Sequence, residues 1–354
     1  MRRPTNRNSP GLGPTVLYVR RWHVSGVVHW AISLQAGLRD LGHESILLTR
    51  CRTNESTGPA AIHEWLSPEL DDGTRLATLR RVVRYCRNER PHHVHMVDGD
   101  IAVAAGLAFT RTPCSFSLHV YPTSFKTRAL VFMIGVLTRS IIAQTQDHAN
   151  DIAARCHLPR RWLHIVGNMV QPPMATRWGE PSRRSVGIVS RLTSNKGLEH
   201  LATVAALLDQ HDGFSMVVHG DGPARAQIEG SCPSSVRFTG MTLDIDDIYA
   251  DIDVLLIVSP DEVGPTTAIE AAVRGIPVVS MYPLPGVLEA LGELALIPPQ
   301  PDADSCVALI TTAARSSTDR PSARALHERT TQHCDRAVVA ARFISELQIP
   351  APGR

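Results

Sequence analysis

The sequence has little lysine, few aromatic residues and almost no excess of either charge. Only two of its 36 basic residues are lysines, Lys126 and Lys196. Aromatic residues make up 5% of the 354 residues, and the formal net charge is +2. The chain therefore lacks both the basic surplus and the stacking side chains typical of nucleic-acid-binding proteins. We exclude nucleic acid as a partner, and the rarity of lysine draws attention to Lys196.

Long apolar runs and paired cysteines are also absent. The longest apolar stretch, residues 129–137, is much shorter than the roughly 20 residues that span a bilayer. We expect no integral membrane span and interpret this stretch as a buried helix, with a membrane-touching amphipathic helix as the alternative. The seven cysteines are scattered and never spaced CxxC, which favours free thiols in a reducing cytosol over a disulfide framework or a zinc cluster. We predict a soluble, cytoplasmic protein.

The composition that remains is that of a globular α/β protein. Hydrophobic residues make up 43% and charged residues 20%, and the length is about twice that of a typical domain. Apolar strands alternate with amphipathic helices, which is typical of parallel sheets covered by helices on both faces. A change to Pro-rich, polar sequence marks a linker. We predict two Rossmann-like, doubly wound parallel-sheet domains that face each other across a cleft.

The predicted boundaries follow from this change of pattern. They are a disordered tail (1–13), an N-terminal domain (14–168), a linker (169–185), a C-terminal domain (186–333), and a last helix and tail (334–354). Crossing of this last segment back to the N-terminal domain is one alternative. In the second half the pattern predicts strands at 186–190, 214–219, 236–239, 253–258 and 277–280, and helices at 198–209, 223–229, 265–274 and 334–347. In the first half it predicts a helix at 28–41 and strands at 15–19, 45–49, 94–97, 114–120 and 141–145.

The strongest local feature is a turn between a buried strand and a helix predicted to begin at Pro265. Proline suits the first helical position. The N–H groups of Thr266 and Thr267 would then point out of the helix start and form an anion site suited to phosphate. Glu262 and Glu270 place carboxylates beside that site, where sugar or ribose hydroxyls are natural partners. The alternative is that both glutamates are ordinary surface residues.

Two further strand–turn–helix junctions carry chemically useful residues. The segment VGIVSRLTSNKG at 186–197 contains Arg191 and Lys196, a planar fork and a mobile point charge that together suit a diphosphate. The segment HGDGP at 219–223 contains glycines that allow close backbone approach. Ligands of such sheets bind beyond the carboxyl ends of the strands. All three junctions therefore lie on the predicted ligand side.

These three junctions, in this order and followed by a tail helix, resemble the C-terminal half of the retaining glycosyltransferases of family 4, which have the GT-B fold. Glu262 and Glu270 match the E-x7-E signature of that family, and SRLTSNKG resembles its G-R-L-x-x-x-K-G segment. HGDGP resembles its G-x-G-P turn, and VRFTGMT resembles the F-x-G segment before the nucleotide-base loop. In the first half, SGVVHWAISLQAGLRDLGHESILLT resembles the glycine-rich loop, helix and strand of the family. The histidine of SLH falls where the family has a strand-end histidine, and GNMV resembles its P-N-G-V segment.

The sequence departs from the pattern at three places. Ser25-Gly26 stands where the family has Gly-Gly, Met169 replaces a glycine, and the aromatic residue after Glu262 is missing. None of these departures removes a charge that the implied mechanism requires.

The resemblance implies roles for individual residues. It makes the first half an acceptor domain and the second a nucleotide-sugar domain. Glu270 would hold the ribose hydroxyls, Glu262 the hydroxyls of the donor sugar, and His119 would approach that sugar near its C6 hydroxyl. The implied catalytic residues are Glu262, His119, Arg191 and Lys196. The implied donor-binding residues are Gly26, Arg191, Lys196, Met241, Thr242, Glu262, Gly264, Pro265, Thr266, Thr267 and Glu270.

The implied activity is retaining transfer of a sugar from a nucleotide-sugar co-substrate to a hydroxyl. UDP-sugar is favoured because it is the commoner donor in the family. Without a spanning helix or a basic membrane face in the sequence, we favour a small soluble acceptor, as in bacterial natural-product biosynthesis. The alternatives are a lipid-linked or cell-envelope glycan acceptor, a non-catalytic GT-B subunit, and a nucleotide-sugar epimerase. The oligomeric state is left open.

Two segments invite a metal interpretation, although we predict neither a required metal nor a permanently bound cofactor. Asp98-Gly-Asp100 has the DxD form that metal-dependent transferases of another fold use, but it ends a strand, and we expect a capping turn. His92, His93 and His95 lack a neighbouring Cys or carboxylate partner.

Overall fold

The computed structural model describes residues 13–22, 26–52, 63–64, 74–170, 173, 184–211, 213–242, 244–316 and 320–350. The tail predicted at 1–13 lies almost entirely outside these residues, as does most of the linker predicted at 169–185. The chain divides into two compact units. The first comprises 1–167 and 336–354, and the second comprises 168–335.

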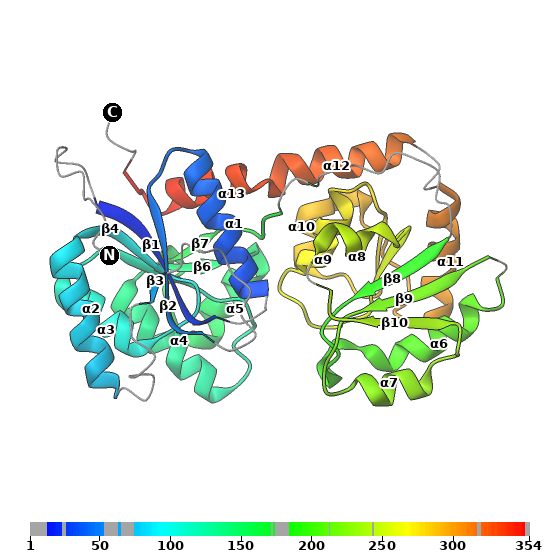
Figure 1. The fold of residues 1–354 in the computed structure, drawn as a ribbon, viewed down its shortest axis with the longest axis horizontal. Coiled ribbons are helices and arrows are strands. Elements are labelled where there is room, and N and C mark those ends of the chain that lie inside the picture. The colour runs from blue at the N-terminus through cyan, green and yellow to red at the C-terminus, as the bar shows by residue number, and fades with distance from the viewer. Residues whose placement is uncertain are drawn as a thin grey trace. The chain divides into compact units, whose positions relative to one another are not determined.

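The first unit is built on a seven-stranded parallel sheet with the strand order β3-β2-β1-β4-β5-β6-β7. The chain runs outward from β1 in one direction and from β4 in the other, so right-handed crossovers place helices on both faces. Helices α1 and α13 lie on one face, and α2, α3 and α4 lie on the other (Figure 1). The strands are β1 (Gly13–Trp22), β2 (Ser45–Arg52), β3 (His63–Glu64), β4 (Pro91–Met96), β5 (Cys114–Ser117), β6 (Ile141–Ala143) and β7 (Leu163–Ile165). The helices are α1 (Gly26–Asp40), α2 (Arg75–Glu89), α3 (Ile101–Thr110), α4 (Phe125–Thr138), α5 (Gln146–Cys156) and α13 (Arg336–Glu346).

The last helix, α13, packs on α1. A Cβ at Gly37 of α1 would lie 2.4 Å from the carbonyl oxygen of Arg336, and Arg336 Nε donates to Asp40 Oδ2 over 2.7 Å. Phe343 of α13 is fully buried. This helix therefore forms part of the hydrophobic layer that covers the first sheet.

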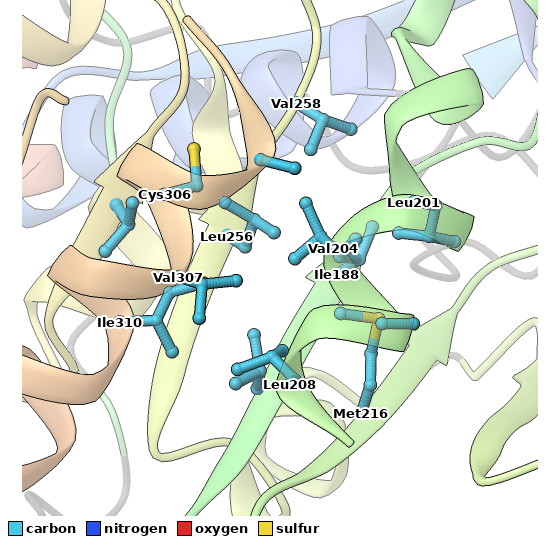
Figure 2. Close-up of a cluster of buried hydrophobic side chains, with 14 of the residues drawn as sticks. Ile188, Leu201, Val204, Leu208, Met216, Leu256, Val258, Cys306, Val307 and Ile310 are labelled. Carbon is cyan, nitrogen blue, oxygen red and sulfur yellow. The ribbon is translucent and has the colours of Figure 1, made fainter. Parts of the chain in front are cut away.

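The second unit contains a five-stranded parallel sheet with the strand order β10-β9-β8-β11-β12. One part of its core lies between the sheet and helices α6 and α11, where Ile188, Val204, Leu208 and Ile310 belong to one cluster of buried side chains (Figure 2). The strands are β8 (Ser185–Val189), β9 (Ser215–His219), β10 (Val236–Gly240), β11 (Val254–Ile257) and β12 (Val278–Ser280). The helices are α6 (Leu201–Leu208), α7 (Arg225–Ser231), α8 (Ile245–Ala250), α9 (Thr266–Ala272), α10 (Pro285–Leu291), α11 (Ala303–Ser316) and α12 (Arg320–Cys334).

Both units are doubly wound parallel α/β structures, which confirms the predicted fold class. In the second half, the strands and helices predicted from sequence end within two residues of those observed, with the start of helix 198–209 formed by a 3₁₀ turn (Leu198–His200). The strand predicted at 114–120 is shorter and ends at Ser117. His119 therefore lies in the loop that follows.

Helix α4 contains the apolar stretch at 129–137, and only one of its sides is buried. Val131 and Ile134 are buried in the core. Phe132, Met133 and Val136 are 45%, 46% and 42% exposed. The expectation of a buried helix is therefore wrong for its outer side, because the stretch is apolar all round and the sheet covers only one face. No helix in the described part of the chain combines the length and the apolar character needed to cross a membrane.

Candidate functional site

The predicted donor residues of the second unit gather at one edge of its sheet. Since β8, β9, β10 and β11 are parallel, the loops that follow them meet at the carboxyl edge. Backbone hydrogen bonds join three of these loops: Ser190 N donates to His219 O over 3.0 Å, and Gly220 N donates to Gly240 O over 2.8 Å. Arg191 and Lys196 follow β8, Met241 and Thr242 follow β10, and Glu262 to Glu270 follow β11.

Lys196 and Glu262 meet directly at this edge. Lys196 Nζ donates to Glu262 Oε1 in an ion pair that joins two loops. Their side chains are 17% and 24% exposed, so a ligand at the surface can reach both. Gly197 makes the approach possible: its φ is 67°, and a Cβ there would lie 2.1 Å from the carbonyl oxygen of Val258 at the end of β11. Arg191, which precedes Lys196 in the same loop, is exposed.

The turn after Glu262 is held from two sides. Asn168 Nδ2 donates to the carbonyl oxygen of Gly264. On the other side, a Cβ at Gly286 of α10 would lie 2.4 Å from Gly264 Cα. Gly264 stands where the resembled family has an aromatic residue, and Val263 before it is buried. Contacts with Asn168 and Gly286 therefore fix the position of Gly264, and no ligand is needed to hold the turn there.

Helix α9 begins one residue later than predicted. Pro265 is its N-cap, with φ −67° and ψ 116°, and Thr266 is the first helical residue. The correction is small because proline's fixed φ suits either position. The first N–H groups of a helix have no acceptor within it. Thr266 and Thr267 thus present backbone donors close in sequence to Glu262.

Glu270 is positioned by a residue that the sequence interpretation missed. The hydroxyl of Tyr249 of α8 lies 2.9 Å from Glu270 Oε2 and 3.2 Å from the Thr267 carbonyl oxygen, two acceptors that share its single hydrogen. Arg274, one turn after Glu270, donates to the Glu270 carbonyl oxygen over 2.8 Å and lies over the Tyr249 ring at 5.1 Å. Burial and the neighbouring Glu270 carboxylate raise the pKa of Tyr249 well above its usual value, so its hydroxyl stays protonated and remains a donor. The local sequence pattern carried no signal for this contact, because Tyr249 and Glu270 lie on different helices.

Gly26 and His119 are the two predicted site residues that belong to the first unit. Gly26 is the exposed first residue of α1. A Cβ at Gly26 would meet no described atom within 4 Å. Packing among the described residues therefore does not require glycine there, whereas a ligand approaching the backbone would.

His119 belongs to a chain of hydrogen-bonded side chains that extends from β4. Ser117 Oγ lies 2.9 Å from His119 Nε2 and 3.2 Å from His95 Nε2. Ser115 Oγ lies 2.8 Å from both His95 Nδ1 and His93 Nε2. At the far end, Gln144 Nε2 lies 2.5 Å from His119 Nδ1. We define these side chains as the histidine–serine chain: His93, Ser115, His95, Ser117, His119 and Gln144.

The hydrogen bonds assign the same tautomer to His95 and His119. The single hydrogen of Ser117 is donated to the Val97 carbonyl oxygen over 3.0 Å, so His95 and His119 must each donate from Nε2. Burial lowers the pKa of His93 and His119 to about 3 and that of His95 well below its usual value. The chain is therefore uncharged at neutral pH, and both ring nitrogens of His119 already have partners.

The two metal-like segments have structural partners. Asp100 caps α3, accepting from Ala102 N over 3.0 Å, and Asp98 accepts from Arg20 N over 2.7 Å. This is the capping turn predicted from sequence. His92 contacts Thr15 Oγ1 at 2.9 Å. Across the described residues, no three His, Cys, Asp or Glu side chains are grouped so as to hold a metal ion.

Comparison with known proteins connects both halves of the chain to one group of enzymes. A family profile described as Glycosyltransferase Family 4 matches residues 24–172. A second, described as Glycosyl transferases group 1, matches residues 183–315. The GDP-mannose-dependent alpha-mannosyltransferase of Mycolicibacterium smegmatis is 26% identical over 291 residues, which cover 73% of this chain and 76% of that protein.

Of two further similarities, one covers a shorter part of the sequence and the other is a similarity of structure. The 2-deoxystreptamine glucosyltransferase of Streptomyces kanamyceticus is 29% identical over 175 residues, and the chain spans only 45% of the length of that relative. The solved structure of Anabaena HepE in complex with UDP and glucose superimposes with a TM-score of 0.77 at 16% identity, covering 95% of this chain and 99% of HepE. That likeness shows the fold. The chain belongs to the family 4 type of glycosyltransferases and has their GT-B fold.

Proposed function

We propose that this glycosyltransferase transfers a hexosyl group from a nucleotide sugar to an acceptor hydroxyl with retention of the anomeric configuration. The observation that carries the proposal is the pairing of Lys196 with Glu262 at the same sheet edge as the Tyr249-anchored Glu270. A cation beside two oriented carboxylates fits a ligand that combines a diphosphate with hydroxyl-bearing rings.

The proposed roles divide the donor into its parts. Arg191 and Lys196 bind the diphosphate, Glu270 accepts from the ribose hydroxyls, and Glu262 accepts from the sugar hydroxyls. The remaining proposed contacts surround these groups: the N–H groups of Thr266 and Thr267 toward phosphate, Gly264 and Pro265 in the turn, Met241 and Thr242 beside the base, and Gly26 of the first unit toward phosphate.

The proposed reaction is a front-side displacement. The acceptor oxygen bonds to the anomeric carbon on the face that the nucleotide leaves, and the bond from that carbon to the phosphate oxygen breaks. The acceptor proton passes to the departing phosphate, so no protein base is needed. Lys196 and Arg191 offset the charge that develops on the leaving nucleotide, which makes the protein's contribution electrostatic and positional.

His119 is proposed to contact the transferred sugar near its C6 hydroxyl. Because burial lowers the pKa of His119 to about 3 and so keeps its imidazole neutral, His119 would act as a polar neighbour and not as a cation for phosphate. Its contact with a hydroxyl would require exchange of one partner, most simply the amide of Gln144 at Nδ1. We expect His119→Ala to lower turnover more than nucleotide affinity.

The donor base and the acceptor are the finer parts of the proposal. UDP-sugar is the first candidate donor, in line with the UDP in the HepE structure, and the mannosyltransferase relative makes GDP-mannose the second. A small polyhydroxylated acceptor in bacterial natural-product biosynthesis is the first candidate, in line with the 2-deoxystreptamine glucosyltransferase. A lipid-linked acceptor is the second, favoured by the exposed apolar side of α4.

Thermal unfolding with UDP, GDP, ADP and their common sugar conjugates tests the proposal. A ligand at about 100 times its Kd adds about 2.7 kcal/mol to the stability of the folded protein and shifts the Tm by several degrees. We expect one nucleotide to shift the Tm of the wild type and of the exposed control Glu293→Ala, but not of Glu270→Ala. A nucleotide sugar that shifts the Tm and is epimerised without transfer would favour the epimerase. One that shifts the Tm and is neither epimerised nor transferred would favour the non-catalytic subunit.

A further inference from the structure

Helix α4 presents an apolar stripe to solvent on the side away from the sheet. Its four exposed side chains are 79%, 45%, 46% and 42% exposed, and we define them as the α4 outer face: Phe125, Phe132, Met133 and Val136. At the helical period they fall within an arc of about 100°. Val131 and Ile134, which are buried against the sheet, lie on the opposite side of the helix.

Cations border this stripe and acidic residues are absent from it. Lys126 lies on one edge, and Arg128 and Arg139 lie on the other side toward the two helix ends. No Asp or Glu occurs between Asp100 and Asp147 in the sequence. Both Lys126 and Arg139 are exposed. A helix with one apolar stripe between basic edges is typical of helices that lie in a membrane interface.

The helices beside α4 continue the basic surface. Helices α2, α3 and α4 form one layer on the same face of the first sheet (Figure 1). Among the described residues, α2 and the position after it expose five arginines and one glutamate. Phe109 is exposed in the last turn of α3, and the exposed Arg111 follows that helix. The exposed arginines of or next to α2 are Arg75, Arg80, Arg84, Arg87 and Arg90. The sequence led us to expect no basic membrane face, and the exposed arginines of this layer argue against that expectation.

We infer that the α4 outer face docks on an anionic lipid surface, with the helix lying parallel to it and its four apolar side chains among the acyl chains. The charge argues against a second copy as the occupant, because a symmetric dimer through this face would bring like charges together. Anionic headgroups supply the complementary charge, and each nearby Lys or Arg strengthens such binding. The inference concerns the first unit and does not depend on which nucleotide the second unit binds.

Sedimentation of the full chain with vesicles tests this inference. We expect binding to vesicles of phosphatidylcholine mixed with phosphatidylglycerol, weakened by salt, and little binding to phosphatidylcholine alone. Phe125→Ser/Phe132→Ser and Lys126→Glu/Arg139→Glu should each lower the partition coefficient by about tenfold or more. The matched controls lie outside α4: Leu41→Ser/Leu288→Ser for exposed apolar area and Arg39→Glu/Arg342→Glu for charge. These controls should retain binding.

Three results would overturn the inference. The first is no binding of the wild type to either vesicle, and the second is equal binding by the α4 variants and their controls. The third is a wild type that is dimeric by light scattering and becomes monomeric in Phe125→Ser/Phe132→Ser, which would assign the face to self-association. UDP titration of the same variants separates this question from donor binding, because we expect their nucleotide affinity to be unchanged.

Discussion

Lys196 donates a hydrogen bond to Glu262 from a different loop, although 66 positions separate the two residues in the sequence. The contact pairs a lysine, which attracts a phosphate, with a glutamate, which repels it. A diphosphate that binds Lys196 therefore also meets the Glu262 carboxylate, unless that carboxylate turns toward a sugar hydroxyl. This coupling makes the two side chains testable as a unit.

We predict that Lys196→Ala weakens UDP binding by about tenfold or more, and that adding Glu262→Gln restores part of the loss. The restoration follows because the single variant leaves an uncompensated carboxylate beside the phosphate, and we expect a coupling of about 1–3 kcal/mol. Isothermal titration of the wild type, both single variants and the double variant measures it. The exposed pair Arg324–Glu328 is the control, and additive losses at Lys196 and Glu262 would contradict the prediction.

We predict that Tyr249→Phe weakens UDP binding by about fivefold, because the lost hydroxyl no longer orients Glu270, a hydrogen bond worth about 1 kcal/mol. The ring and its packing are kept. If Glu270 accepts from the ribose, most of the loss should disappear when the titration uses 2′-deoxy-UDP. Tyr282→Phe, which removes a hydroxyl near His200, is the control. An equal loss with both nucleotides would show that Tyr249 acts through the fold alone.

The alternation of strands and helices was predictable because most strands of the second unit are short, largely buried apolar runs, such as Val254–Ile257. The approach of Lys196 to Glu262 was predictable only through resemblance, since it depends on the close contact of Gly197 with the end of β11. Tyr249 was missed because its contact with Glu270 arises from the packing of α8 against α9, which local pattern does not encode.

The sequence interpretation preferred a buried helix at α4 over an amphipathic one for a different physical reason. A helix that is apolar all round gives no periodic signal for which side the sheet covers. Phe132 and Val131 are adjacent in sequence and both apolar, yet one is exposed and the other buried. Only the position of the helix on the sheet separates them.

We predict that Gly197→Ala destabilises the protein by about 2–4 kcal/mol and also weakens UDP binding. Alanine is strained at a φ of 67°, and its Cβ would meet the Val258 carbonyl oxygen at 2.1 Å, so the Lys196 loop must move. Gly230→Ala in α7 is the matched control, since its Cβ meets no described atom within 4 Å, and a helical alanine should be neutral or stabilising by up to about 1 kcal/mol. Urea unfolding measures both, and equal effects would refute the role of Gly197.

We predict that the first unit loses stability as the pH falls from 6.5 toward 3. His93 and His119 have pKa values of about 3 in the folded protein and near 6.5 when unfolded, so within this window the unfolded chain binds more protons and acidification favours it. Each of the two should contribute a slope of up to about 1.4 kcal/mol per pH unit. Urea unfolding followed by tryptophan fluorescence reports mainly on this unit, which holds four of the five tryptophans. His119→Gln should flatten the slope relative to the wild type and to the exposed His211→Gln; an unchanged slope would mean that His119 is protonated in the fold, and the uncharged histidine–serine chain would be wrong.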